Sequence, residues 1–278
     1  MTHPTQIGFL GGGHMSRALI SGLVSRANSE IGPSSIHVFD RNAEKNNSLH
    51  NEFDINKHAS AVDLVSASDV VIIAIKPQGV KQALLDLRSP LLSRPRLLLS
   101  VAAGVTTHSM QDWLGDSVAI ARAMPNMSAL IGQGATGLYA CHTVTDQQKG
   151  LVEQILTTVG VCEWVDSDQQ LDLVTALSGS GPAYFLLMLN SMIKHAVKAG
   201  LNEASAKRLA IQTMKGTALL IEQGDAEVAD LIDQIRSPNG TTDRAIRSFT
   251  KDDLDTSVAN AMQAAQDRAQ EMACNLDN

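Results

Sequence analysis

The hydrophobic pattern changes once along this chain of 278 residues, and the change limits the fold more than any other feature. Up to about residue 165, short apolar runs alternate with amphipathic stretches, which is typical of β-α-β units in an open sheet. Several runs are apolar at every position, as expected for parallel strands covered on both faces. We expect strands at residues 7–10, 36–39, 70–75, 97–102, 118–121, 136–140 and 161–165.

Beyond residue 165, long segments with a period near 3.6 residues replace the strand-like runs. They predict helices at residues 169–177, 182–199, 203–223, 227–235 and 255–273. We therefore expect an α/β domain over residues 1–165 and an all-α domain over residues 166–278. Apolar clusters around Phe185 and Leu219 suggest helix faces left over for a partner subunit.

Composition excludes several classes of function. Lys and Arg number 22 against 29 Asp and Glu, a net charge of −7, which argues against a nucleic-acid-binding surface. The 3 cysteines (Cys141, Cys162 and Cys274) have no ligand spacing, so we expect reduced, buried thiols and no metal site. No run approaches the length of a membrane span and no signal peptide is evident, so we expect a cytoplasmic protein with no membrane partner.

A glycine-rich turn follows the first expected strand. Residues 7–10 lead into Gly11, Gly12 and Gly13, and Ser16 completes a G-x-G-x-x-S pattern at the start of a helix. In a dinucleotide site the first glycine permits the tight turn, and the second lets the backbone approach the pyrophosphate. The small third residue lets the helix pack on the strand. The alternative is a glycine-rich turn that binds no ligand.

The second expected strand ends at Asp40 and Arg41, where such folds bind the adenosine ribose. Asp40 could accept a hydrogen bond from the ribose 2′-hydroxyl, or it could instead be the N-cap of the next helix. Arg41, with Asn42 and Lys45 nearby, could bind a 2′-phosphate. The choice between NADH and NADPH therefore stays open.

Two later strands end in small or polar residues at the same edge of the sheet. The run at 70–75 ends in Lys76 and Pro77, and the run at 97–102 continues into Ala103. Small residues there suit the approach of a flat ring. Lys76 could approach a cofactor or substrate, or it could be a solvated lysine at a strand end.

Two unusual stretches lie in the helical part. Residues 237–243 read Ser-Pro-Asn-Gly-Thr-Thr-Asp, which is the composition of a backbone anion site opening onto a helix. The alternative is an interhelical turn with Thr242 or Asp243 as N-cap. Residues 178–184 form a second small-residue loop, for which packing against the first domain is the alternative. Without hydrolase or metal motifs, hydride transfer is the chemistry that remains.

Together these motifs resemble the pyrroline-5-carboxylate reductase family over nearly the whole chain. The resemblance is carried by residues 7–16, 74–77, 101–106, 122–126, 177–184 and 237–242. It implies a Rossmann-type dinucleotide-binding domain followed by an all-α dimerisation domain. It also implies reduction of 1-pyrroline-5-carboxylate to L-proline with NADPH or NADH, the last step of proline biosynthesis. A homodimer or higher homo-oligomer, with active sites between subunits, is implied as well.

The resemblance also implies roles for single residues. The cofactor site would comprise Leu10, Gly11, Gly12, Gly13, His14, Met15, Asp40, Arg41, Ala74, Ile75, Lys76, Pro77, Ala102 and Ala103. The substrate carboxylate would be held by backbone amides of the loop formed by Ser237, Pro238, Asn239, Gly240, Thr241 and Thr242. The Thr242 hydroxyl would be the catalytic group, because it would hydrogen-bond the ring nitrogen while hydride reaches the adjacent carbon.

The chain departs from the family pattern at a few positions: His14, Arg236, Asn239 and the pair Met127-Ser128. Arg236 could strengthen anion binding or shift substrate preference, and Asn239 is tolerable because asparagine adopts positive φ. A hydroxyacid dehydrogenase with a helix-borne lysine, such as Lys194 or Lys198, is an alternative enzyme. A third hypothesis is a regulator that binds NAD(P) without turnover.

Overall fold

The computed structural model describes residues 4–26 and 31–277, with side chains as far as residue 273. Residues up to Ser180, together with those from Ala265 onward, form one compact unit, and Gly181–Ala264 forms a second. The division by contacts falls after the predicted boundary at residues 165 and 166, which stays a prediction.

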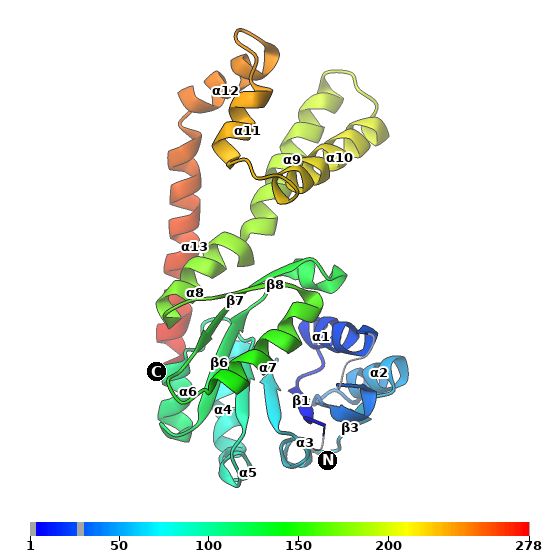
Figure 1. The fold of residues 1–278 in the computed structure, drawn as a ribbon, viewed down its shortest axis with the longest axis vertical. Helices are drawn as coiled ribbons and strands as arrows, with labels where there is room; N and C mark the ends of the chain where they lie inside the picture. The colour runs from blue at the N-terminus through cyan, green and yellow to red at the C-terminus, as the bar shows by residue number, and fades with distance from the viewer. Residues whose placement is uncertain (1–3, 27–30, 278) are drawn as a thin grey trace. The chain divides into compact units, whose positions relative to one another are not determined.

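The first unit is built on a sheet of eight strands in the order β3-β2-β1-β4-β5-β6-β7-β8 (Figure 1). All neighbouring pairs are parallel except β6 and β7. The strands are β1 (Ile7–Leu10), β2 (Ile36–Phe39), β3 (Asn56–Lys57), β4 (Val70–Ile73), β5 (Leu97–Ser100), β6 (Ala119–Met124), β7 (Gly134–Ala140) and β8 (Gly160–Trp164). The seven predicted strands are present. The two-residue β3 escaped prediction because Asn56 and Lys57 are exposed polar residues without an apolar signal.

Two strands end earlier than their apolar runs. β4 stops at Ile73 and β5 at Ser100, two residues before the predicted ends at 75 and 102. The remaining apolar residues belong to the loops that follow. Those loops therefore lie at the carboxyl edge of the sheet, where a parallel sheet places its ligand sites.

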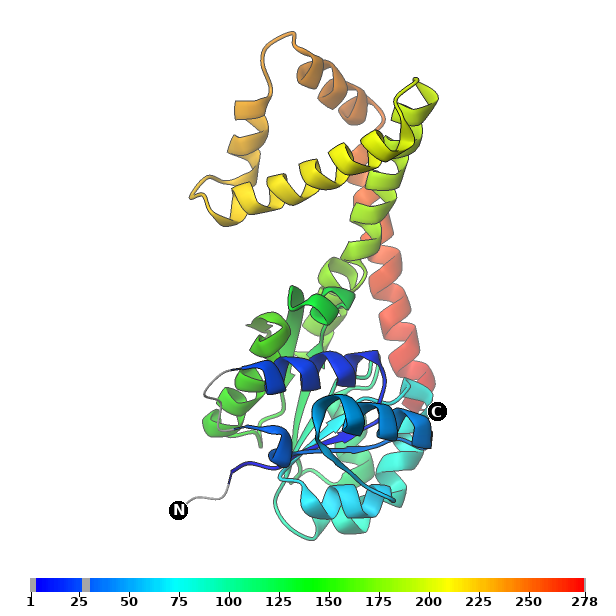
Figure 2. The ribbon, with the colours of Figure 1, turned by 90° about the vertical axis from the view of Figure 1, so that its right-hand side faces the viewer.

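Helices cover both faces of the sheet (Figures 1 and 2). One face carries α1 (His14–Ser25), α2 (Ala43–Phe53) and α7 (Asp146–Leu156), which contact one another through α1. The other carries α3 (Ala61–Ala67), α4 (Val80–Asp86), α5 (Arg88–Leu92) and α6 (Thr107–Leu114). α8 (Asp168–Val174) packs on β7.

The core between these layers is mainly aliphatic. Ile7, Phe9, Leu19 and Ile72 are fully buried, as the parallel sheet requires. Cys141 is buried and Cys162 half-buried, and both are free thiols. The side chain of Cys274 lies outside the described residues.

The second unit is helical. It comprises α9 (Gly181–Lys198), α10 (Glu203–Glu222), α11 (Val228–Ile235) and α12 (Thr241–Lys251), and it includes the start of α13 (Leu254–Asp277). α9 and α10 pack against each other. The predicted all-α character is confirmed.

The prediction of a loop at residues 178–184 is wrong. A π-helical turn at Thr175–Gly179 connects α8 to α9, and the Ser180 amide donates to the Thr175 carbonyl at 2.8 Å. The Thr175 and Ser178 hydroxyls donate to the preceding turn of backbone. A side chain at Gly179 would lie 2.9 Å from the Met124 methyl, so small residues serve close packing here.

Apolar side chains of α9 and α10 are unusually exposed. Phe185 and Leu187 are each 68% exposed, whereas only Gly181 and Leu189 of α9 are buried. Among the described helices, the continuous stretch 168–198 is long and apolar enough, by length and composition alone, to cross a membrane. An apolar helix that its own chain leaves uncovered needs another surface to cover it.

Candidate functional site

The turn after β1 depends on a glycine. The Gly11 amide donates to the Phe39 carbonyl at 2.8 Å, which ties the turn to the end of β2. Gly11 has φ 110°, and a Cβ there would lie 2.6 Å from the Ala74 carbonyl oxygen. Any other residue would be strained and would clash with the start of the β4 loop.

The next residues leave open space at the start of α1. Gly13 is the N-cap of α1, and no side chain caps that helix. A Cβ on Gly13 would meet no protein atom within 4 Å, and its φ of −79° suits any residue. Ser16 is buried, and its hydroxyl donates to the Gly11 carbonyl at 2.6 Å. The uncapped start of α1 therefore faces open space, and helix starts of this kind bind anions.

Asp40 holds the glycine turn through main-chain contacts. One carboxylate oxygen accepts from the Gly12 amide and the other from the Asn42 amide, both at 2.8 Å. Burial by itself raises the pKa of Asp40, but these two amides and Lys45 outweigh it and lower the pKa below its ordinary value. The N-cap alternative for Asp40 is wrong, because the Asn42 side chain caps α2 by accepting from the Glu44 amide.

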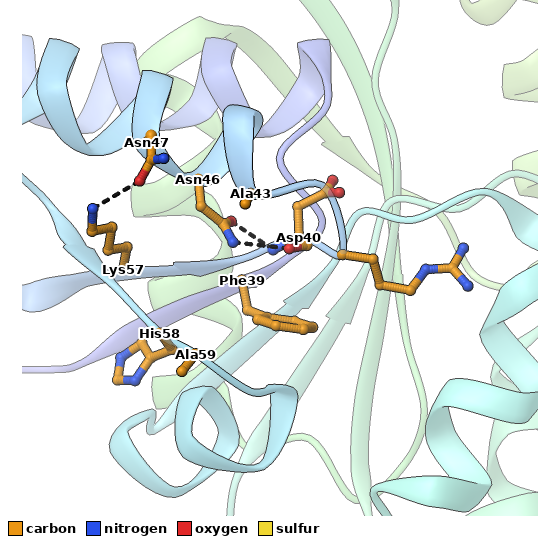
Figure 3. A pocket seen from close by; sticks show the side chains of 9 residues that line it. Phe39, Asp40, Ala43, Asn46, Asn47, Lys57, His58 and Ala59 are labelled. Carbon is orange, nitrogen blue, oxygen red and sulfur yellow. Dashed lines mark hydrogen bonds between the residues drawn. The ribbon is translucent and has the colours of Figure 1, made fainter.

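A pocket of about 560 Å³ lies beside Asp40 at the ends of β2 and β3 (Figure 3). Asn46 fixes its inner wall, because its side chain hydrogen-bonds both the amide and the carbonyl of Asp40 at 2.7 and 2.8 Å. Lys57 lies on the opposite wall and donates to Asn47. The pocket is lined by Phe39, Asp40, Arg41, Ala43, Asn46, Asn47, Lys57, His58 and Ala59. Sequence reasoning missed Lys57 and His58 because it missed β3.

The loops after β4 and β5 lie at the same edge as the glycine turn. The Ala74 amide donates to the Leu10 carbonyl at 2.9 Å, and the Val101 amide to the Ile73 carbonyl at 3.1 Å. Ala102 is buried, whereas Lys76 is exposed at the start of a short 3-10 turn, Pro77–Gly79. The structure thus places the predicted residues 10–15, 40–41, 74–77 and 102–103 along one edge of the sheet.

A buried ion pair that the sequence did not reveal braces this unit. Arg122 on β6 pairs with Asp168 at the start of α8, and both side chains are largely buried. The Thr107 amide and hydroxyl donate to the other Asp168 oxygen at 3.0 and 2.6 Å. Burial raises the pKa of the neighbouring Asp172, with Asp168 adding to the effect. Arg122 lies in one of the motifs, but its partner is 46 residues away in sequence, so no local pattern identified it.

The predicted substrate loop lies in the second unit, between α11 and α12. The Gly240 amide donates to the Ser237 carbonyl at 2.9 Å, which closes a β-turn around Pro238 and Asn239. Asn239 has φ 58°, as expected for asparagine replacing glycine. The N-cap alternatives Thr242 and Asp243 are wrong, because α12 begins at Thr241 with Gly240 as N-cap and no capping side chain. Because Gly240 has no side chain, no side-chain acceptor caps the backbone amides at the start of α12.

The described residues contain no group of three His, Cys, Asp or Glu side chains arranged to hold a metal ion. The glycine turn of the first unit and the 237–242 loop of the second are each built mainly from backbone amides, hydroxyls and small side chains. Such a set binds anions and orients a reactant.

Comparison with known proteins identifies relatives over the whole chain. The family model described as "Pyrroline-5-carboxylate reductase dimerisation" matches residues 168–272, and "NADP oxidoreductase coenzyme F420-dependent" matches residues 6–104. A pyrroline-5-carboxylate reductase from Pseudomonas aeruginosa is 38% identical over 96% of this chain and 97% of its own length.

Solved structures agree with this match. A pyrroline-5-carboxylate reductase from Coxiella burnetii has a TM-score of 0.92 at 34% identity, covering 97% of this chain and 99% of that one. The Plasmodium falciparum pyrroline carboxylate reductase with NADP bound has a TM-score of 0.86 at 28% identity, covering 98% of this chain and 100% of that one. The predicted fold class is confirmed.

Proposed function

This chain belongs to the pyrroline-5-carboxylate reductase family, and from that premise we propose how its own residues carry the family's reaction. It is an NAD(P)H-dependent oxidoreductase that reduces 1-pyrroline-5-carboxylate to L-proline by hydride transfer to the cyclic imine carbon, the last step of proline biosynthesis. The hydroxyacid dehydrogenase and the non-enzymatic regulator therefore lose their support. The roles of single residues in this reaction are part of our proposal.

The dinucleotide pyrophosphate would lie against the start of α1, held by amides of Gly13 and His14. Gly13 carries this part of the proposal. Its backbone conformation does not require glycine, and no atom from the rest of the protein lies within 4 Å of where its Cβ would be, so that space is open to a ligand. Bound phosphate oxygens would satisfy the amides that the uncapped helix leaves free.

The adenosine end would occupy the pocket beside Asp40. Arg41 and Lys57 line that pocket and are exposed cations, so they could neutralise a 2′-phosphate. Both carboxylate oxygens of Asp40 already accept hydrogen bonds from backbone amides, which reduces the repulsion between Asp40 and a phosphate group. We infer a preference for NADPH over NADH.

The nicotinamide ring would lie along the loops at Ala74–Pro77 and at Ala102 and Ala103. Their alanines carry no atoms beyond Cβ, so a flat ring could approach the backbone. When bound, NADPH supplies the hydride for the reaction. Leu10, Met15, Ile75 and Pro77 would help to exclude water from the reacting carbon, because their side chains are apolar and all four are at least partly buried.

The 237–242 loop would hold the substrate carboxylate with amides of the first turn of α12. Gly240 offers no capping side chain, so these amides and the positive end of the helix dipole can receive an anion. Thr242 lies in the same turn and is half-buried. Its hydroxyl would form a hydrogen bond with the ring nitrogen and so hold the imine for hydride attack.

The chain carries the dimerisation domain of its family, over residues 168–272. We propose that a second copy covers the exposed apolar side chains of α9 and α10, which also accounts for the apolar stretch 168–198 without a membrane. We further propose homodimers or higher homo-oligomers located in the cytoplasm, where reduced nucleotide cofactors are available.

Steady-state oxidation of NADPH and of NADH with racemic 1-pyrroline-5-carboxylate tests the function. We expect turnover with both and a larger kcat/KM with NADPH. Folded protein that binds NADPH but does not oxidise it with this imine would contradict the proposed substrate.

A further inference from the structure

The two ends of the 237–242 loop are joined by charged side chains. Arg236, which caps the end of α11, donates through Nε to one Asp243 oxygen at 2.8 Å. Arg247, one turn further along α12, places its Nε 3.1 Å from the other Asp243 oxygen. The Asp243 side chain is only 4% exposed. The loop is therefore closed at its base by an ion-paired cluster of Arg236, Asp243 and Arg247.

The main chain shows why this closure matters. The Arg236 amide donates to the Ile232 and Asp233 carbonyls, so its backbone belongs to the last turn of α11. Asp243 belongs to the first turn of α12, directly after the amides of Thr241 and Thr242. The bond from Arg236 to Asp243 thus fixes the end of one helix against the start of the next. A single β-turn connects the two helices, and its Asn239 has a left-handed backbone conformation.

The two arginines also change the net charge near the start of α12. A carboxylate in the first turn of a helix suits the helix dipole, but it repels a second carboxylate bound at the same amides. Here two guanidinium groups neutralise Asp243, which leaves the cluster with a net charge of +1. The Arg236 hydrogen bond is the main cause of a lowered Asp243 pKa, so this carboxylate stays ionised and paired at neutral pH.

We propose that Arg236 is a positioning residue for the imine carboxylate: through Asp243 it holds the 237–242 loop in its binding shape, rather than contacting the substrate. The proposal rests on the proposed function of that loop. For Arg236 to reach the substrate, it would have to leave a buried carboxylate, and breaking such a pair is costly.

The test compares five variants of the whole enzyme, four single and one double, by KM for 1-pyrroline-5-carboxylate, KM for NADPH and kcat. In Arg236→Gln we expect KM for the imine to rise about tenfold, with kcat and KM for NADPH within about twofold of wild type. Arg236→Lys keeps the charge and should recover part of the loss. Arg244→Gln is the matched control, because Arg244 is an exposed arginine of the same helix turn and should change KM for the imine less than about twofold.

Asp243→Asn separates positioning from direct contact. If Arg236 is a positioning residue, Asp243→Asn should also raise KM for the imine. In the Arg236→Gln/Asp243→Asn double variant this KM should be no higher than in the more impaired single variant. If Arg236 instead bound the substrate, freeing it by Asp243→Asn would lower KM, and that result would overturn the proposal. Equal effects of Arg236→Gln and Arg244→Gln would overturn it too, since only net charge would then matter.

The two proposals fail in different ways. If wild type reduces the imine but Arg236→Gln behaves like wild type, only the positioning role is wrong. If folded wild type does not reduce the imine at all, the proposed substrate is wrong, and the role of Arg236 for that substrate is rejected with it. Thermal melting of each variant shows whether a rise in KM follows from unfolding.

Discussion

At the scale of single residues, Asp40 and Arg41 are neighbours with separate tasks. Asp40 supports the glycine turn through the Gly12 amide, whereas Arg41 is exposed in the pocket that we propose for the adenosine end of the cofactor. We therefore expect Asp40→Ala to raise Kd for NADPH and NADH by similar factors, because an amide of the shared turn loses its acceptor.

Arg41→Gln should raise Kd for NADPH about tenfold and leave Kd for NADH nearly unchanged. Titration of nicotinamide fluorescence measures both, and equal losses in Arg41→Gln would contradict a 2′-phosphate contact.

In the proposed reaction, Thr242 is the residue on which the chemical step depends most directly. Thr242→Ala should lower kcat/KM for the imine by about tenfold to a hundredfold, because a hydrogen bond to the reacting nitrogen is lost. Thr242→Ser retains the hydroxyl and should recover most of the activity. Kd for NADPH should not change in either variant. An unaltered kcat/KM in Thr242→Ala would show that the Thr242 hydroxyl does not contribute to the reaction.

Sequence reasoning worked best for residues whose role lies in the backbone. Gly11 needs positive φ and Asn239 can adopt it, and both were identified from residue type alone. Side-chain pairing was not predictable in this way. The partners of Arg122 and Arg236 depend on how helices and strands meet, and nothing in the local pattern marks Asp168 or Asp243 as their acceptors.

At the scale of elements, a histidine pair connects β2 to the residue after β3. In the neutral pair, His37 Nε2 donates to the Gln6 side-chain oxygen at 2.8 Å, and His37 Nδ1 accepts from His58 Nε2 at 2.9 Å. The two facing nitrogens hold one proton between them, so the two rings cannot both be charged. Burial lowers the pKa of His37, with His58 adding to the effect and Asp69 opposing it. Burial also lowers the pKa of His58, against the opposing charge of Asp63.

The pair predicts a pH dependence of stability. A histidine in the unfolded chain has a pKa of about 6.5, and lower folded values mean that the unfolded state binds more protons just below that pH. Stability is then fully present above about pH 6.5 and is lost as the pH falls toward the folded pKa values. We expect Tm to decrease from pH 7.5 to pH 5.5. His58→Gln should flatten that decrease, whereas His142→Gln, at an exposed position, should not; identical slopes in both variants would exclude the pair as the cause.

Elements with strong periodicity were predictable, and those that depend on neighbours were not. The continuous apolar runs predicted β4 and β5 but not their ends, because residues 74–75 and 101–102 are as apolar as the strands before them. The join between α8 and α9 was predicted as a loop because three small residues are typical of one. In the structure these residues serve a π-helical turn that packs on Met124.

At the scale of the whole molecule, the exposed apolar surface of the helical unit predicts its assembly. Leu187→Asp should shift the protein toward monomers, because a charge would be buried where a second copy packs. Leu92→Asp makes the same change at an exposed leucine of α5, outside the dimerisation match, and should leave the mass unchanged. Sedimentation equilibrium measures this, and an unchanged mass for Leu187→Asp would contradict an interface on that face of α9.

The change of periodicity near residue 165 predicted the two architectures in their correct order along the chain. It did not reveal that residues from Ala265 onward join the first unit, because a uniform helical period carries no information about which partner a helix contacts.

The central claim is that this chain transfers hydride from a bound nicotinamide to the imine carbon of 1-pyrroline-5-carboxylate. NADPH carrying deuterium at both C4 positions, incubated with the enzyme and the imine, tests this directly by mass spectrometry of the product. The account predicts L-proline with one deuterium, on the former imine carbon. Proline without deuterium, or no proline from folded enzyme that binds the cofactor, would contradict it.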